Sequence, residues 1–312
     1  MESRIVTVFG GSGFIGRYVV RRLAAADWVV RVAVRDTDSA LFLKVAGDPG
    51  QVVPFPADVT DDASVARAVA GADAVINLVG ILYQRGRRTF QRLHVDAAAA
   101  IAKAARAAGA GRLVQMSALG ADLDSPAEYA RTKAAGEKAA AEAFPGATII
   151  RPSVVFGPED DFLNRFAMMA RIMPVLPVFP TRFQPVWVGD VAEAFFRVVD
   201  DPATAGKTYE LGGPQVVTFR ELMQLILHET ARRCLLLPIP MALAEAEAFF
   251  LEKLPVPPLT RDQVKLLGSD NVVAPGALTL HDLGIEATAM EAVVPAYLDR
   301  FRPQSRQRLR LG

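Results

Sequence analysis

The 312-residue chain is 51% hydrophobic and 22% charged, a balance that predicts one or two folded domains with a large core and excludes a disordered chain. A net charge of +1 provides no excess of positive charge for nucleic acid, and the single cysteine, Cys234, excludes an internal disulfide and fits a reducing compartment. The three histidines lack the spacing of a metal site, and no apolar stretch approaches the roughly 18 residues of a membrane span.

The first predicted element is a buried strand over residues 5–9, which runs directly into Gly10, Gly13 and Gly16 and a helical pattern over 14–26. A strand that stops on glycines and opens a helix brings bare backbone N–H groups and a helix N-terminus together, where a pyrophosphate can bind. The pattern therefore predicts a dinucleotide site. It begins so close to Met1 that we expect no signal or transit peptide.

Strand and helix patterns continue to alternate after this unit. Strands are predicted over 29–34, 52–56, 74–79, 112–117 and 147–156, and helices between them over 62–70, 90–108 and 129–143. This alternation predicts an α/β fold with a Rossmann-type, doubly wound parallel sheet. We expect a dinucleotide-binding domain over residues 1–158, which residues of about 184–213 rejoin.

The regular alternation stops after residue 158. Three prolines make 173–183 a predicted loop, Asp190 is predicted to cap a helix over 191–199, and Thr218 and Glu221 have the spacing of a capping box. We expect residues 159–183 and 214–300 to form a smaller C-terminal lobe on the substrate side, interleaved with the last part of the sheet. Residues 301–312 are expected to form a basic tail.

The end of the second strand is expected to decide which dinucleotide is bound. Arg35 follows this strand, and Arg17 beside Gly16 is near enough to reach the same place; guanidinium groups suit the 2′-phosphate of NADP. Asp36 is at about the distance from the glycines at which NAD proteins place an acidic residue. The sequence therefore favours NADP(H) and leaves NAD(H) as the alternative.

Ser117, Tyr129 and Lys133 form the predicted catalytic set. Tyr129 and Lys133 are one turn apart on a predicted helix, and Ser117 ends the preceding strand, at the edge of the sheet where ligands bind. The set resembles that of short-chain dehydrogenase/reductase proteins, in which the Tyr hydroxyl acts as general acid or base, the Lys lowers its pKa, and the Ser polarises the substrate oxygen. We expect the three side chains to converge on one site, whether or not they catalyse a reaction.

Several motifs together resemble the extended or atypical short-chain dehydrogenase/reductase (SDR) superfamily: Gly10–Gly16, Tyr129–Glu137 and Arg151–Pro158. Three later segments, 159–166, 184–192 and 260–267, are similar to the NADPH-binding accessory subunit of respiratory complex I and its bacterial relatives. The similarity extends to about residue 300. It implies a tightly bound NADPH, with Asp58 and Val59 against the adenine and Asn77 and Gly80 in the turn after the fourth strand. The complete set expected to bind the nucleotide is Gly10, Ser12, Gly13, Phe14, Ile15, Gly16, Arg17, Arg35, Asp58, Val59, Asn77, Gly80, Tyr129, Lys133 and Pro152.

The resemblance implies an accessory or assembly subunit associated with NADH:quinone oxidoreductase, with the nucleotide structural or sensory. The alternative is a free NADP-dependent reductase, dehydrogenase or epimerase acting on a sugar, sterol or quinone-like substrate. The expected location is cytoplasmic, peripheral on the cytoplasmic face of a bacterial inner membrane. An acid-free arginine tail fits contact with anionic lipid or an acidic partner, or a solvated chain end; its arginines are Arg300, Arg302, Arg306, Arg308 and Arg310.

Overall fold

A computed structural model describes residues 4–255 and 257–303, which form two compact units. Unit 1 comprises Met1–Pro152, Gly189–Leu211 and Ala274–Glu286, and unit 2 comprises Ser153–Val188, Gly212–Val273 and Ala287–Gly312. No helix among the described residues is long and apolar enough to cross a membrane.

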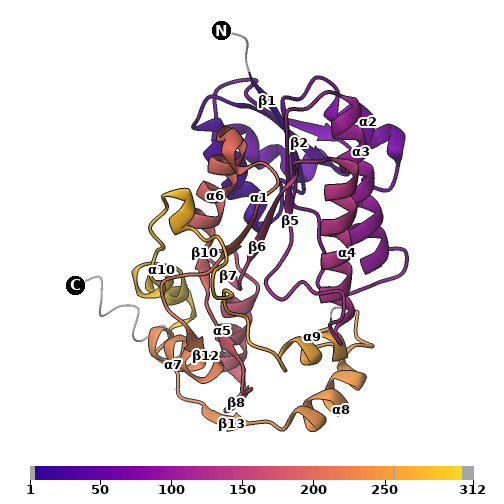
Figure 1. Cartoon of the computed structure of the whole chain (residues 1–312). Helices are drawn as coiled ribbons and strands as arrows, with labels where there is room; N and C mark the ends of the chain where they lie inside the picture. Colours follow the sequence, from indigo (N-terminus) through magenta and orange to yellow (C-terminus); the bar gives the residue numbers. More distant parts are fainter. Residues whose placement is uncertain (1–3, 256, 304–312) are drawn as a thin grey trace, which may run out of the picture. The chain divides into compact units, whose positions relative to one another are not determined.

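Unit 1 is built on a seven-stranded parallel sheet in the order β11-β6-β5-β4-β1-β2-β3 (Figure 1). The order reverses between β1 and β4, which confirms the predicted doubly wound, Rossmann-type sheet. Both of these central strands are mostly apolar and almost wholly buried, as a parallel sheet covered on both faces requires. The strands are β1 (Ile5–Phe9), β2 (Val29–Val34), β3 (Val52–Pro56), β4 (Ala74–Asn77), β5 (Arg112–Met116), β6 (Thr148–Pro152) and β11 (Thr208–Leu211).

Helices cover both faces of this sheet. On one face α2 (Asp62–Val69), α3 (Ala97–Ala107) and α4 (Glu128–Ala143) pack side by side, and on the other α1 (Phe14–Ala24) and α6 (Val188–Asp200) are joined by an Arg22–Glu193 ion pair (Figure 1). An apolar core that includes Phe9, Ile101 and Leu113 lies between the first group and the sheet. Short helices η1 (Asp38–Ala46), η3 (Pro202–Thr204) and η4 (His281–Leu283) complete the unit.

Unit 2 is a smaller α+β assembly with an aromatic core. Phe219 lies at its centre, with ring centroids of four other phenylalanines 5.3–6.0 Å away. Its two-stranded sheets pair β7 (Val155–Phe156) with β10 (Val186–Trp187), β8 (Val175–Val178) with β13 (Leu235–Pro238), and β9 (Arg182–Phe183) with β12 (Val217–Thr218). Its helices are α5 (Phe162–Ile172), α7 (Phe219–Glu229), α8 (Met241–Leu251), α9 (Arg261–Leu266), α10 (Met290–Leu298) and the short η5 (Asp299–Phe301).

The structure corrects four predicted elements. The strand predicted over 147–156 is two strands, β6 and β7, which belong to different sheets. The loop predicted over 173–183 contains β8 and β9, because their backbone groups pair with partners remote in sequence. Helix α6 begins at Val188, so Asp190 lies in its first turn and is not its N-cap.

The last correction concerns the helix predicted over 90–108. It opens as a π-helix, η2 (Gln91–Asp96), before α3 continues it. A π-helical turn inside a longer helix commonly marks a functional site.

The predicted capping box of Thr218 and Glu221 is confirmed.

Candidate functional site

The turn between β1 and α1 forms a backbone cradle at the point where the strand order reverses. Gly10 has a left-handed backbone (φ +78°), and the Gly13 N–H donates to its carbonyl at 3.1 Å. Gly13 is the N-cap of α1 and supplies no side chain to the first N–H groups of the helix. A Cβ on Gly16 would collide with the Gly10 carbonyl and the Gly11 backbone, so only glycine permits this close turn. The geometry suits the pyrophosphate of a dinucleotide.

The side chains around this cradle differ in their accessibility. Ser12, Phe14, Ile15 and Arg17 are half-buried, whereas Gly13 is exposed. The Arg17 guanidinium lies over the Phe42 ring at 5.1 Å from its centroid, in the segment that follows β2. This contact places a positive charge beside the segment where the second ribose of a dinucleotide is expected.

Arg35 and Asp36, which follow β2, differ in how their side chains are engaged. One Asp36 oxygen accepts the backbone N–H of Asp38 at 3.1 Å, which engages its carboxylate in a local turn. The Arg35 guanidinium is exposed and has no hydrogen-bond or ion-pair partner within residues 4–255 and 257–303. The cation at this strand end is therefore the more available group for a ligand.

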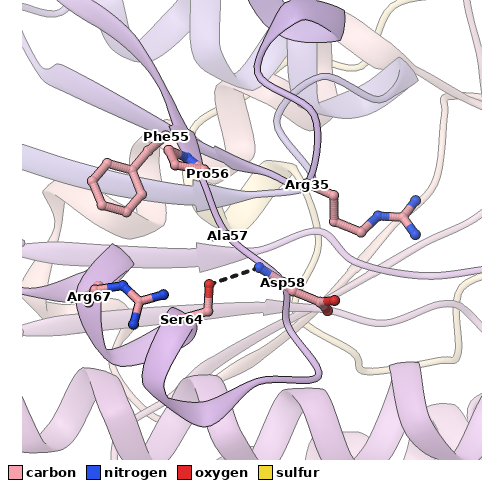
Figure 2. Close-up of a pocket in the computed structure, with 7 residues that line it drawn as sticks. All are labelled: Arg35, Phe55, Pro56, Ala57, Asp58, Ser64 and Arg67. Atoms are coloured by element: carbon pink, nitrogen blue, oxygen red, sulfur yellow. Dashed lines mark hydrogen bonds between the residues drawn. The ribbon is translucent and has the colours of Figure 1, made fainter.

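A pocket of about 330 Å³ lies at the ends of β2 and β3. Figure 2 shows Arg35 and Arg67 on opposite sides of the Phe55–Asp58 segment, with the Asp58 N–H donating to the Ser64 hydroxyl at 3.1 Å. The N–H and hydroxyl of Thr60 lower the pKa of Asp58, and the charges of Arg35 and Arg92 lower it further. Asp58 is therefore an ionised carboxylate, able to accept an exocyclic amine; the half-buried Val59 follows it.

The turn after β4 is fixed by Asn77. Its side chain is buried, donates to Gln115 Oε1 at 2.8 Å and accepts the Val79 N–H at 3.0 Å. Gly80 follows, and a Cβ at this position would lie 3.3 Å from the Lys133 ammonium nitrogen. The small residue thus lets the turn approach Lys133.

The structure places Ser117, Tyr129 and Lys133 within one region of unit 1. Lys133 Nζ lies 5.9 Å from the Tyr129 ring centroid and 3.4 Å from the carbonyl oxygen of Met116, the residue before Ser117. The Ser117 Oγ atom is buried and has no hydrogen-bond partner among the described residues. A buried hydroxyl without a hydrogen-bond partner destabilises the folded protein by about 1–3 kcal/mol, and a ligand or water that bonds it removes this penalty. The Ser117 hydroxyl is thus left for a bound molecule.

Burial controls the protonation of this set. It raises the pKa of the Tyr129 phenol to about 12 and lowers the pKa of the Lys133 ammonium to about 8, against the opposing pull of Glu137. Near neutral pH the protein alone therefore holds Tyr129 protonated. A bound nicotinamide would supply hydride chemistry, while Tyr129 would hold a proton and Lys133 a positive charge at its ribose.

His94, which no sequence pattern singled out, connects these groups. His94 Nε2 accepts the Ile81 N–H at 3.2 Å, and Nδ1 lies 3.0 Å from Thr132 Oγ1, which itself donates to the Glu128 carbonyl. The imidazole stacks on Phe90 at 5.1 Å and meets the edge of Tyr129 at 5.3 Å between ring centroids. His94 therefore ties the Asn77–Gly80 turn to the helix that carries Tyr129 and Lys133.

The close contact of η2 with α4 depends on Gly136. A Cβ there would overlap the carbonyl of His94. The sequence feature that could have indicated this contact is Gly136, a small residue one turn after Lys133, which allows another backbone to approach. A lone histidine in an alanine-rich helix carries no such signal.

Arg151 and Pro152, the last two residues of β6, both contact other residues of the fold. The Pro152 carbonyl accepts the Leu119 N–H at 3.0 Å, which holds the loop after Ser117. Arg151 forms ion pairs with Glu137 at 2.7 Å and Glu210 at 3.3 Å. These pairs engage its guanidinium inside unit 1 and leave it unsuited to bind a substrate phosphate.

Only part of the predicted basic tail is described. Arg300 donates to Asn164 Oδ1 at 2.7 Å, and Arg302 forms ion pairs with Glu229 and Asp299, all within unit 2. Arg306, Arg308 and Arg310 lie outside the described residues. Two of the five arginines therefore stabilise the fold and are not available as a charged tail.

Comparisons with known proteins identify a nucleotide-binding family. Residues 10–159 match the family model of NAD(P)H-binding domains. The chain is 38% identical over 314 residues to NADH dehydrogenase (ubiquinone) 1 alpha subcomplex subunit 9, mitochondrial, of Arabidopsis thaliana, covering 96% of this chain and 78% of that protein. It is 39% identical over 200 residues to ceramide reductase of Caulobacter vibrioides, covering 60% of this chain and 58% of that protein.

The fold has solved relatives as well. The structure of triphenylmethane reductase of Citrobacter sp. complexed with NADP(H) superposes with a TM-score of 0.75 at 20% identity, covering 94% of this chain and 99% of that one. At this identity the likeness shows the fold alone. The extent and identity of the sequence match confirm the resemblance predicted from the motifs. The chain belongs to the NAD(P)H-binding family that contains NADH dehydrogenase (ubiquinone) 1 alpha subcomplex subunit 9.

Proposed function

We propose that the protein is an accessory or assembly subunit of an NADH:quinone oxidoreductase, in which unit 1 holds NADP(H) as a structural or sensory ligand. The observation that carries this proposal is how much of the chain is similar in sequence to the Arabidopsis subunit. The nucleotide-binding family model ends at residue 159, whereas the match to the Arabidopsis subunit covers 96% of the chain. The sequence identity of 38% that the two proteins share therefore extends through unit 2, beyond the nucleotide-binding family model.

The choice of NADP(H) rests on the end of β2. Arg35 is exposed and has no hydrogen-bond or ion-pair partner among the described residues, while the Asp36 carboxylate accepts a backbone N–H of its own turn. A free guanidinium attracts a 2′-phosphate and gives no advantage to the 2′-hydroxyl of NAD.

A structural ligand also fits the environment of the Ser117–Tyr129–Lys133 set. General acid or base catalysis is most efficient with a pKa near the working pH. Burial instead raises the pKa of Tyr129 to about 12, and the lowered pKa of Lys133, about 8, weakens the positive charge that would stabilise a phenolate. In the nucleotide-free chain, the raised pKa of Tyr129 favours a hydrogen-bonding role over acid–base catalysis, which supports the proposal.

A free reductase is the second candidate. It is favoured by the buried, unsatisfied Ser117 hydroxyl, which is suited to a substrate oxygen, and by the similarity to ceramide reductase over 60% of the chain. That match covers less of this chain than the match to the oxidoreductase subunit does.

We infer a peripheral position for the protein, on the cytoplasmic face of a bacterial inner membrane, where an NADH:quinone oxidoreductase would hold it. We separately propose that the tail contacts anionic lipid directly, through Arg306, Arg308 and Arg310. Flotation of the protein with anionic vesicles, before and after removal of residues 304–312, tests it.

Tyr129→Phe separates the two candidate functions, with Tyr18→Phe on α1 as the matched control. In a host that lacks the native chain, both variants should restore NADH:quinone oxidoreductase activity and retain NADP(H) as the wild type does. A Tyr129→Phe variant that keeps its nucleotide but loses an NADPH-consuming activity that the wild type and Tyr18→Phe show would establish turnover and contradict the structural role.

A further inference from the structure

Residues 74–95 of unit 1 contain four arginines and no aspartate, glutamate or lysine. Three of the arginines lie in a tight hairpin, in which Arg85 and Arg88 exchange two backbone hydrogen bonds of 3.0 Å. Arg87 and Arg88 are exposed. We call residues 84–90 the arginine hairpin.

The arginine hairpin is held in place by side chains at its base. Gln84 Oε1 accepts the Phe90 N–H at 2.9 Å, and Gln84 Nε2 donates to Glu128 at the start of α4 at 3.1 Å. Arg92 donates to the Arg87 carbonyl at 3.2 Å. A loop braced in this way loses little conformational entropy when it binds, so its charges are presented at low cost.

Several other arginines of unit 1 have acidic partners. Arg4 pairs with Asp200 at 2.8 Å, Arg151 with Glu137 at 2.7 Å, and Arg22 with Glu193. The guanidinium groups of Arg87 and Arg88 have no such partner within the described ranges 4–255 and 257–303. Two unpaired charges on a braced loop are a feature that the stability of unit 1 does not require.

We propose that the arginine hairpin is a docking surface for an acidic patch on a partner protein; the inference rests on the proposed role as an oxidoreductase subunit and names the surface that attaches it. The hairpin's chemistry favours protein over lipid. Protein interfaces are enriched in arginine and depleted in lysine, and this stretch has only arginine. Leu82 beside it is 53% exposed and adds apolar contact area. Carboxylates match guanidinium groups bidentately, which fixes orientation as well as attraction.

The test reverses the charges of the hairpin in the full chain. The variant Arg87→Glu/Arg88→Glu is compared with Lys103→Glu/Arg106→Glu, an equal charge change at two exposed positions of α3. Membranes of the native host, solubilised in mild detergent, are separated on a native gel, and the fraction of each chain that co-migrates with NADH:quinone oxidoreductase activity is measured. Nucleotide content verifies that each variant is folded.

We expect the hairpin variant to keep its nucleotide while its co-migrating fraction falls about 10-fold or more, and the α3 variant to behave as the wild type. Undiminished co-migration of the hairpin variant would overturn the inference and leave the proposed function standing. Failure of the wild-type chain to co-migrate would overturn the proposed function and the inference with it. If only binding to phosphatidylglycerol vesicles falls in the hairpin variant, the surface recognises lipid and the inference is wrong.

Discussion

His94 accepts a hydrogen bond from the Ile81 N–H at 3.2 Å, and this bond fastens the turn after β4 to the region of Tyr129 and Lys133. The bond requires a neutral ring nitrogen. Burial, and then the charge of Lys133, lower the pKa of His94 to about 3. Protonation of His94 would therefore break the connection between two parts of the expected nucleotide site.

This relationship predicts an acid-sensitive fold. The pKa of His94 is lower in the folded chain than in the unfolded chain, so the unfolded chain binds the additional proton and stability falls as the pH drops from 6.5 towards 3. Below pH 6 the wild type should lose about 1.4 kcal/mol per pH unit relative to His94→Gln, which keeps an acceptor but does not titrate. Urea unfolding of both chains between pH 7 and pH 5 measures this; parallel pH profiles would contradict a buried neutral His94.

The lowered pKa of Lys133 predicts that the unfolding free energy also depends on pH in the alkaline range. Its pKa is about 8 in the fold and 10.5 when exposed, so between these values the native state has lost a proton that the unfolded chain retains. The unfolding free energy of the nucleotide-free wild type should therefore rise relative to Lys133→Met between pH 8 and pH 10, by at most about 3 kcal/mol. A difference that is constant with pH would show that Lys133 is not desolvated.

Two glycine variants separate folding from binding at the cradle. A Cβ at position 16 collides with backbone, so Gly16→Ala should lower the Tm by several degrees and abolish nucleotide binding. A Cβ at position 13 meets only the Gly10 carbonyl at 3.3 Å and otherwise points to open space. Gly13→Ala should therefore keep a near-native Tm in the absence of nucleotide and weaken NADPH binding, as measured by calorimetry. Equal NADPH affinity in Gly13→Ala and the wild type would show that the pyrophosphate does not bind at this turn.

Arg35→Ala tests the choice of cofactor. Loss of a charge-assisted pair with the 2′-phosphate should weaken NADPH binding about 10-fold and leave NADH binding nearly unchanged. Arg67→Ala is the matched control, because Arg67 lines the same pocket from α2. An equal effect of Arg35→Ala on both nucleotides would contradict the assignment of NADP(H).

In unit 2, the Tyr297 hydroxyl donates to the buried Asp160 carboxylate at 2.8 Å, and the same carboxylate accepts the N–H groups of Leu163 and Asn164 at the start of α5. Tyr297→Phe removes one of these bonds and should destabilise unit 2 by about 1–3 kcal/mol. A double-mutant cycle with Asp160→Asn measures the coupling by denaturant unfolding. Additive effects would show that the bond contributes nothing.

The sequence predicted those parts of the site that depend on local pattern. The strand, glycine and helix succession from Ile5 to Ala24 is encoded within 20 neighbouring residues, as is the one-turn spacing of Tyr129 and Lys133. The remaining features depend on partners distant in the chain. His94 meets Thr132 across 38 residues and Arg151 meets Glu210 across 59, and the break between β6 and β7 follows from pairing with β10. Local periodicity contains no information about these contacts.

The central claim is tested most directly by native fractionation of the tagged wild-type chain from membranes of its own host, with nucleotide released by denaturation and identified by mass. The account predicts co-migration with NADH:quinone oxidoreductase activity and about one retained NADP(H) per chain. A chain that migrates alone, exchanges NADPH freely and consumes it would contradict the account and establish a free reductase.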